Sequence, residues 1–473
     1  MDSINRRSFL HRATTGALGV SLAPQLAGLV AFASRQDSAA TGRGGRRADY
    51  GPLVTAGPEL ALPEGFHYAK FGLGGTQLSN GTLTPGGHDG MACFATDRPD
   101  RVRLVRNHEL SGPRDRLDLW RAVGDPRRAY DPQGPGGTST IELGLGRNRA
   151  PEVIGAWMSL TGTLINCAGG STPWGSWLSC EETTRGTADG LSRDHGYVFE
   201  VLASSNGPVE PVPLKAMGRF VHEAIAMDPD TQVVYLTEDQ TAAGFYRFIP
   251  TARHRRMEAG SLREGGKLQA LAITDARAWD TRRAQRPAAA YQVRWVDIEE
   301  PDPATALPGA VFAQGVAKGA AIFARLEGAW WGDGSAYFHA TNGGDAQLGQ
   351  VWRYRPGKDL TGGATDDGGQ LILVYESRAR ETLQSPDNIT MSPRGGLVLC
   401  EDGAGTCHLH GLSPEGEIFP FARNVFNQRE FAGACFSPDG QVLFVNIQGG
   451  TGGRPNDVGM TFAIWGPWEK GAL

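Results

Sequence analysis

Val221–Asp239, which reads VHEAIAMDPDTQVVYLTED, is the stretch that decides the fold. An acid, Glu223, stands near its start, followed by an apolar run, a turn built on Asp-Pro-Asp, a second apolar run and a closing acid. Short apolar runs separated by Pro, Asp or Gly turns are typical of antiparallel strand pairs. The stretch therefore predicts two neighbouring strands, with acids where the pair begins and ends.

The same pattern recurs along the chain. Three further close copies and two looser ones lie at 325–342, 385–402, 430–446, 88–109 and 166–182. Repeated strand pairs with tight turns indicate a β-propeller, whose blades surround a central channel. We therefore expect an all-β protein, a six-bladed β-propeller with a few loop and helical insertions.

Acids at equivalent positions of such a fold lie at equal heights around the axis and must converge. Like charges so close stay ionised only if positive charge lies between them. Bound metal ions are the simplest source of that charge. Two alternatives remain open: the acids cap strands and turns, or the propeller holds no metal. The converging acids are Asp89, Glu223, Glu327, Asp387 and Glu430.

The N-terminus resembles an export signal. Residues 5–10 read NRRSFL, a twin-arginine pattern, and a weakly apolar Gly/Ala-rich run leads to a cleavage-like AFA triplet at 31–33. We expect a twin-arginine signal peptide at 1–33, a flexible lead at 34–55 and the propeller catalytic domain at 56–473. Export by the twin-arginine machinery would give a periplasmic or secreted protein without stable membrane insertion after cleavage.

Composition limits the partners. The net charge of -5 is mild, and no basic stripe indicates a nucleic-acid partner. The 66 Gly and 29 Pro suit many short strands and turns. We expect a monomer that acts on a small molecule.

Six cysteines occur without a CxxC motif, so a structural zinc finger is not expected. Cys407 lies near His408 and His410, a proximity that we interpret as incidental.

The segment 177–182, WLSCEE, places a thiol and two carboxylates at the end of a predicted strand. A thiolate beside acids requires a strongly Lewis-acidic metal, so Cys180 is a candidate transition-metal ligand. Glu181 and Glu182 suit calcium. The alternative is that Cys180 is a buried structural cysteine.

Two further sites carry candidate functional groups. Asn107, His108 and Glu109 follow an apolar strand and offer oxygen and imidazole donors, although they could equally cap the strand end. Arg325 precedes Glu327 by two residues, so both side chains face the same side of a strand. An anion drawn to bound metals could meet Arg325 there.

Taken together, several motifs resemble those of the PhoX-type alkaline phosphatases, a family of exported, calcium-dependent phosphatases built on a β-propeller. The resemblance covers nearly the whole chain after the signal. The motifs are the twin-arginine start, NHE at 107–109, WLSCEE at 177–182, FVHE at 220–223, RLE at 325–327, SPDN at 385–388, FSPDG at 436–440, LFVNIQ at 443–448 and GPW at 466–468.

The resemblance implies a phosphomonoester hydrolase with two ferric ions (Fe3+) and several calcium ions (Ca2+), bridged by an oxo group. By motif position, Cys180, Glu223 and Glu327 would be iron ligands, and Arg325 the phosphate contact. His222 and His108 are the remaining catalytic candidates. The candidate calcium ligands would be Asn107, Glu109, Glu181, Glu182, Asp387 and Glu430.

Two other functions remain open. In a calcium-dependent lactonase or aryl-esterase, calcium would polarise a carbonyl group and His108 or His222 would act as the base. In a non-catalytic exported binding module, calcium would be structural only. Iron in the purified protein would disfavour the first, and turnover of a phosphomonoester the second.

Overall fold

The computed structural model describes residues 48–112, 125–146, 149–304, 309–357, 368–450 and 455–473. Contacts divide the chain into two units, Met1–Arg43 and Gly44–Leu473, and every described residue belongs to the second. The predicted signal peptide and the first part of the flexible lead lie outside the described residues. No helix among the described residues combines the length and apolar character that a membrane crossing needs.

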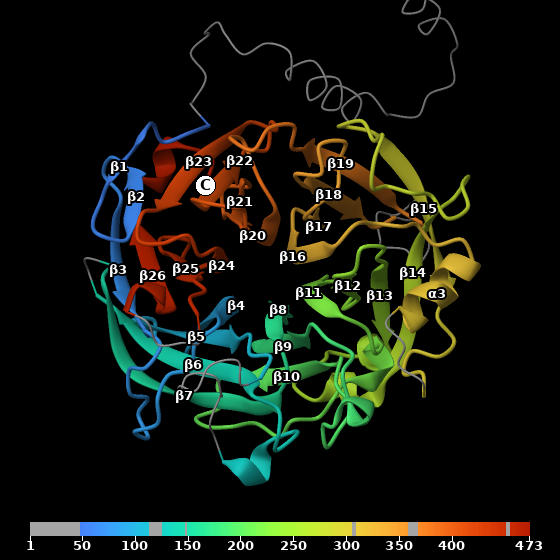
Figure 1. The fold of residues 1–473 in the computed structure, drawn as a ribbon, viewed down its shortest axis with the longest axis horizontal. Coiled ribbons are helices and arrows are strands. Elements are labelled where there is room, and N and C mark those ends of the chain that lie inside the picture. The colour runs from blue at the N-terminus through green and yellow to red at the C-terminus, as the bar shows by residue number, and fades with distance from the viewer. Residues whose placement is uncertain (1–47, 113–124, 147–148, 305–308, 358–367, 451–454) are drawn as a thin grey trace, which may run out of the picture. The chain divides into compact units, whose positions relative to one another are not determined.

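The second unit is a β-propeller, so the predicted fold class is confirmed (Figure 1). Six inner strands stand around the axis, each contacts the next, and the last contacts the first. Each inner strand is the terminal strand of its sheet, so the short inner edges all face the axis. The inner strands are β4 (His88–Ala95), β8 (Asn166–Ser171), β11 (His222–Met227), β16 (Leu326–Gly332), β20 (Pro386–Met391) and β24 (Phe431–Phe436).

Each inner strand pairs antiparallel with the strand that follows it, as the repeated sequence pattern predicts. A third strand continues each pair outward. The second strands are β5 (Arg101–His108), β9 (Ser176–Glu181), β12 (Val234–Glu238), β17 (Ser335–Ala340), β21 (Leu397–Glu401) and β25 (Leu443–Ile447). The third strands are β6 (Gly136–Leu145), β10 (Val198–Leu202), β13 (Phe245–Pro250), β18 (Gln350–Arg355), β22 (His408–Leu412) and β26 (Met460–Trp465).

The outer strands differ from sheet to sheet, and the number of hydrogen-bonded sheets differs from the six blades predicted. The strands make five hydrogen-bonded sheets, because β15 pairs with β19 and joins two groups of strands into one nine-stranded sheet. The outer strands are β7 (Pro151–Thr163), β14 (Gly266–Ile273), β15 (Ala290–Asp297), β19 (Gln370–Glu376), β23 (Ile418–Asn424), β2 (Leu60–Pro63), β1 (Leu53–Thr55) and β3 (His67–Phe71).

The two ends of the second unit are tied together. Strand β3 pairs with β26, so a strand from the start of the fold completes the sheet that ends it. Strand β1 pairs with β2, although 53–55 falls in the segment expected to be a flexible lead. The Tyr50 hydroxyl donates to the Leu473 carbonyl at 2.6 Å. The ordered fold therefore starts before the predicted boundary at residue 56.

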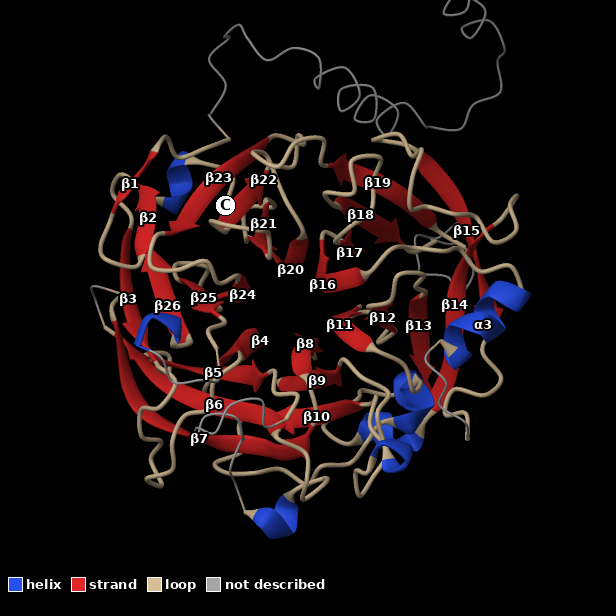
Figure 2. Cartoon of the chain, in the orientation of Figure 1, coloured by secondary structure: helices blue, strands red, loops and turns tan. Residues whose placement is uncertain are grey.

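Helical segments are short and lie between strands (Figure 2). The core lies between the sheets, where both faces of the strands are covered by apolar side chains; Phe245 and Phe338, for example, stack with ring centroids 4.1 Å apart. The described helical segments are α3 (Ala310–Ala317), η2 (Pro126–Arg128), η3 (Thr187–Asp189), η4 (Lys215–Met217), η5 (Thr251–His254), η6 (Ser261–Glu264), η7 (Pro455–Asp457) and η8 (Trp468–Lys470).

Candidate metal centre

Each inner strand has an irregularity near its start, where two of its residues face one residue of the second strand. Such a β-bulge turns a side chain out of the regular alternation. Because the bulges fall at equivalent places, they present their first residues at one level around the axis. These first residues are Asp89, Cys167, Glu223, Glu327, Asp387 and Gly433.

Gly433 occupies the sixth bulge because no side chain fits there. Its φ is +63°, in the region that favours glycine. A Cβ atom on Gly433 would lie 2.4 Å from the Asp89 carbonyl oxygen and 2.8 Å from the Asn446 amide nitrogen. Five bulges therefore supply metal-ligating side chains, and the sixth supplies close backbone packing.

A second tier of acids follows the second strands. The residue after each second strand donates its backbone N–H to a residue just before the inner strand, which fixes its place beside the axis. Four of these residues are acids: Glu109 and Asp402, which bond to Gly87 and Ser385 at 2.8 and 2.9 Å, and Glu182 and Asp239, which bond to Ile165 and Val221 at 2.9 and 3.0 Å.

The side chains of the two tiers, together with Glu430, which directly precedes β24, form one continuous group of ligand atoms, which we call the axial cluster. It contains four triads, and in each triad the ligand atoms all lie within 4.8 Å of one another. Glu223, Asp387 and Glu430 each belong to two triads, so neighbouring triads share a carboxylate. The triads are Cys167–Glu182–Glu223, Glu223–Glu327–Asp387, Asp387–Asp402–Glu430 and Asp89–Glu109–Glu430.

The raised pKa values of these side chains show that the ionised acids repel one another. Burial, together with the charges of Glu327 and Glu182, raises the pKa of Glu223 well above its usual value. Burial and neighbouring acids raise the pKa of Asp387 to about 8. Burial and the charge of Glu223 likewise raise the pKa of the Cys167 thiol. Cations between these groups would remove the penalty, so the donor set fits bound metal ions.

Arg325 is the cation that contacts the axial cluster among the described residues. Its Nε and Nη2 donate to the two carboxylate oxygens of Asp239 at 2.9 and 2.7 Å, and Nη2 also donates to Glu327 at 2.9 Å. Its side chain is 43% exposed, and no described residue bonds to Nη1. The guanidinium is thus fixed at the solvent edge of the cluster with donors left over for an anion.

A model of the family described as "Alkaline phosphatase PhoX" matches residues 48–450. The chain belongs to this family. Its class of activity is therefore that of an alkaline phosphatase-like phosphoric monoester hydrolase, with a small phosphoester as substrate and a dependence on metal. The resemblance seen in the sequence motifs is confirmed.

One solved structure supports the fold. The PhoX of Pseudomonas fluorescens in complex with vanadate, a transition state analogue, is 19% identical, covers 90% of this chain and 99% of its own, and has a TM-score of 0.66. A gluconolactonase from Xanthomonas campestris is 13% identical over 88% of this chain and 99% of its own, with a TM-score of 0.37. No curated protein matches the sequence.

Within this PhoX-family propeller, the axis brings together six of the sequence-predicted metal ligands: Glu109, Glu182, Glu223, Glu327, Asp387 and Glu430. Cys180 does not join them. It lies on the second strand β9, fully buried in a hydrophobic cluster with Val198 and Met217, and burial raises its pKa. The thiol of the axial cluster is Cys167, because it lies at the bulge of the inner strand.

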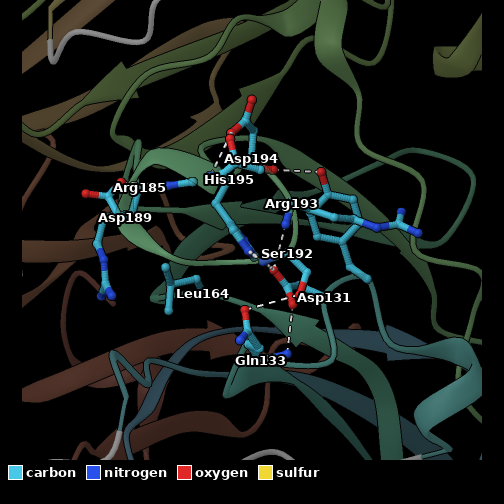
Figure 3. A network of polar contacts seen from close by, with 12 residues as sticks. Asp131, Gln133, Leu164, Arg185, Asp189, Ser192, Arg193, Asp194 and His195 are labelled. Atoms are coloured by element: carbon cyan, nitrogen blue, oxygen red, sulfur yellow. Dashed lines mark hydrogen bonds and ion pairs between the residues drawn. The ribbon is translucent and has the colours of Figure 1, made fainter.

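Glu181 also lies outside the cluster, because its oxygens already have donors. Oε1 accepts from His195 Nδ1 at 2.6 Å and from the Leu164 N–H at 2.9 Å, and Oε2 accepts from the Gly196 N–H at 2.9 Å. Figure 3 shows His195 directed toward Asp131, whose Oδ2 lies 3.4 Å from His195 Nε2. Glu181 therefore has a structural role: its hydrogen bonds fix the end of β9, directly before Glu182, against the segments that contain Leu164 and Gly196.

Asn107 is not among the ligand atoms of the cluster but hydrogen-bonds to the backbone of Cys167 and Ala168. Its amide nitrogen donates to the carbonyl oxygens of Cys167 and Ala168 at 3.1 and 2.7 Å, and its oxygen accepts from Trp177 and Ser179, both at 2.9 Å. The predicted calcium ligand thus stabilises the bulge that presents Cys167.

The two predicted catalytic histidines lie away from the axis. His108 is fully buried, with Nδ1 3.0 Å from the Gly86 carbonyl and Nε2 2.9 Å from the Ser139 hydroxyl. His222 stacks on Phe220, its Nε2 lies 3.0 Å from the Gly218 carbonyl, and burial lowers its pKa to about 4. Neither belongs to a triad of the axial cluster.

Sequence reasoning missed Cys167, Asp239 and Asp402 as site residues. All three lie inside the repeats that predicted the fold, and Asp239 and Asp402 are the closing acids of two copies. Cys167 stands one residue after Asn166, as Glu223 stands after His222. Comparing the repeats position by position would have identified it.

Proposed function

We propose that this protein is an exported phosphomonoester hydrolase whose axial cluster holds iron and calcium. The single observation that carries the proposal is the convergence of eight carboxylates and one thiol within shared triads around the propeller axis, beside Arg325. Such a mixture of a soft donor and many hard oxygen donors suits a transition metal next to calcium ions.

The donor types suggest which residues hold which ion. Cys167, Glu223 and Glu327 would hold iron, because the only thiol of the cluster shares a triad with Glu223, and Glu223 shares a second triad with Glu327. The other carboxylates of the cluster, Glu182 of the thiol triad among them, would hold calcium. When bound, the ions would neutralise phosphate oxygens and supply an activated oxygen nucleophile at the axis.

The residues of the chain itself bind and orient the substrate. Arg325 would donate to a phosphoryl oxygen through Nη1, since Asp239 and Glu327 already accept from its other nitrogens. Asp239 and Glu327 orient the guanidinium and leave Nη1 directed away from them. A fixed cation at this place stabilises the charge of the phosphoryl group without reorganisation.

A cavity of about 450 Å³ is lined by residues that neighbour Arg325 and Asp239 in sequence. Its walls include Ala324, the neighbour of Arg325, and Thr241, two residues after Asp239. A volume of this size accommodates a small organic group. We assign the leaving-group alcohol of the phosphoester to this cavity.

The lactonase alternative requires a histidine that can accept a proton at the axis. His108 and His222 are buried and hydrogen-bonded elsewhere, so the described residues favour the phosphatase. The binding-module alternative makes a different prediction, namely calcium binding without turnover.

Hydrolysis of p-nitrophenyl phosphate by the exported protein, with calcium and iron supplied, tests the proposal. Turnover by the wild-type protein and its loss in Glu223→Gln support it. Calcium binding without turnover contradicts it and favours the binding module. Hydrolysis of lactones but not of the phosphoester favours the first alternative.

Export rests on the twin-arginine pattern at residues 5–10, outside the described residues, and on family membership. Substituting Lys for Arg6 and Arg7 should retain the protein in the cytoplasm with its signal uncleaved. Export at the wild-type rate would contradict this route. A monomer is expected in solution, which light scattering would test.

A further inference from the structure

A second group of metal-type ligands lies outside the axial cluster, where β21 and β22 meet. Glu401 is the last residue of β21, and β22 carries His408 and His410. The two histidines are two residues apart on one strand, so their rings share a face. Their ring centroids lie 5.5 Å apart.

The ligand atoms of these three residues converge. Nδ1 of His408 lies 3.1 Å from Oε2 of Glu401, and Nε2 of His410 lies 3.5 Å from Oε1 of the same carboxylate. All three ligand atoms lie within 4.8 Å of one another. One small cation could contact all three.

His410 is the unusual member of this group. Its side chain is 3% exposed, yet Nδ1 has no partner among the described residues, and Nε2 has only Glu401 Oε1 at 3.5 Å, too poorly placed for a hydrogen bond. A buried imidazole without partners is unfavourable, because both nitrogens have lost water. Other buried histidines of the described chain differ: His108 bonds through both nitrogens, and His222 and His339 each bond through one.

Glu401 also differs from the equivalent residue of another sheet. Glu181 occupies the same place at the end of β9, and backbone N–H groups and His195 occupy both of its oxygens. Around Glu401 the corresponding space holds two imidazoles rather than one. Glu401 is bonded as well, because Oε1 accepts from the Gln384 N–H at 2.8 Å and Oε2 accepts from the His408 N–H at 2.9 Å. The difference from Glu181 is the second imidazole, that of His410, which faces the same carboxylate.

The group is separate from the axial cluster. Asp402, the next residue, belongs to that cluster, and successive residues of an extended chain point to opposite sides. No triad of the axial cluster contains a histidine. Cys407 is not part of the group, since its thiol donates to the Gly403 carbonyl at 3.4 Å.

We propose that Glu401, His408 and His410 form a second metal site, which binds one zinc-type divalent ion through two imidazoles and one carboxylate. Two histidines and a glutamate are a donor set that zinc accepts, with water as the fourth ligand. The side chain of His408 is 28% exposed, so solvent reaches the site. The ion would tie the end of β21 to the start of β22.

The test uses Zn²⁺ as the probe with the full-length, metal-loaded protein. X-ray absorption at the zinc edge reports the ligands directly, because imidazole rings give a scattering pattern that carboxylates do not. We expect one zinc ion with two imidazole ligands. Zinc bound without imidazole, or no zinc bound, would overturn the proposal.

Two variants locate the ion. His410→Gln removes the buried ligand, and His408→Gln removes the partly exposed one, whose loss leaves the buried packing unchanged. Each substitution removes a direct ligand of the ion. It should therefore weaken zinc binding by more than about 100-fold, the largest loss expected when a residue that only hydrogen-bonds to a ligand is removed. His254→Gln changes an exposed histidine outside the group and should leave zinc affinity unchanged.

Phosphatase turnover and axial metal content should persist in both variants. Unchanged zinc affinity in His408→Gln would overturn the second site. Failure of the axial cluster to hold iron or calcium, with zinc still bound through imidazole, would instead contradict the proposed function alone.

Discussion

Arg325 and Asp239 form a two-point ion pair at the edge of the axial cluster, with Nε–Oδ1 and Nη2–Oδ2 distances of 2.9 and 2.7 Å. The backbone of Arg325 has a φ of +43°, which a residue other than glycine rarely adopts. Ile165 and Ser385, which also stand just before inner strands, both have a φ of +49°, so this conformation belongs to the repeat. The proposed role of Arg325 therefore rests on its ion pair with Asp239 and on the unbonded Nη1.

Arg325→Gln should lower kcat/KM for a phosphomonoester about 100-fold, the effect of removing one preorganised donor to a transition-state charge. Steady-state kinetics provide the measurement. Arg127→Gln is a matched control, because Arg127 makes the same two-point pair with Asp125 at 3.0 and 2.9 Å on an exposed turn. Equal activity losses in both variants would contradict the assigned role.

Cys167→Ala should lower the iron content of the purified protein, since the thiol joins Glu182 and Glu223 in one triad. Cys180→Ala should keep its iron, although the small cavity destabilises the fold by about 1 kcal/mol. Elemental analysis of the two folded variants gives the comparison. Iron loss in Cys180→Ala alone would restore the assignment made from the sequence motif.

Glu181 and Glu182 are adjacent but should respond differently to substitution by glutamine. Glu181→Gln places an amide group against backbone donors, so the free energy of unfolding should fall by about 1–3 kcal/mol. Glu182→Gln should lower calcium content with a smaller effect on the metal-free protein. Thermal unfolding and calcium analysis separate the two effects, and identical behaviour would contradict the structural role of Glu181.

Removing metal should make stability depend on pH in an unusual direction. Burial and neighbouring acids raise the folded-state pKa of Asp387 to about 8, above its value in the unfolded chain. The folded state therefore binds more protons than the unfolded chain. The stabilisation that proton binding by Asp387 gives the folded state is complete below about pH 4 and is lost as pH rises through about 8. In chelator, the melting temperature should fall as pH rises across this window.

The metal-loaded protein is the control for that experiment. Bound cations keep the acids ionised, so its melting temperature should change little over the same pH range. A chelated protein whose stability increases with pH would show that the acids do not crowd one another in solution.

The repeated pattern in the sequence predicted the propeller because inner strands and turns alternate locally. It did not predict the pairing of β15 with β19, which joins residues 290–292 to 370–372 and so depends on contacts distant in sequence. The separation into blades follows from such outer contacts. Short local patterns cannot determine them.

The same distinction explains the site. Glu223, Glu327 and Asp387 come together because each starts an inner strand, a position visible in the sequence. The hydrogen bonds that occupy Glu181 and Asn107 come from His195, Trp177 and Ser179, which no local motif reveals. Cys180 stood out because acids follow it directly, whereas the bulge at Cys167 appears only once the strands are paired.

The most direct test of the axial cluster is a crystallographic anomalous difference map recorded at the iron absorption edge. We expect a strong peak bounded by Cys167, Glu223 and Glu327. A map without a peak at the propeller axis, from protein that hydrolyses a phosphomonoester, would contradict it.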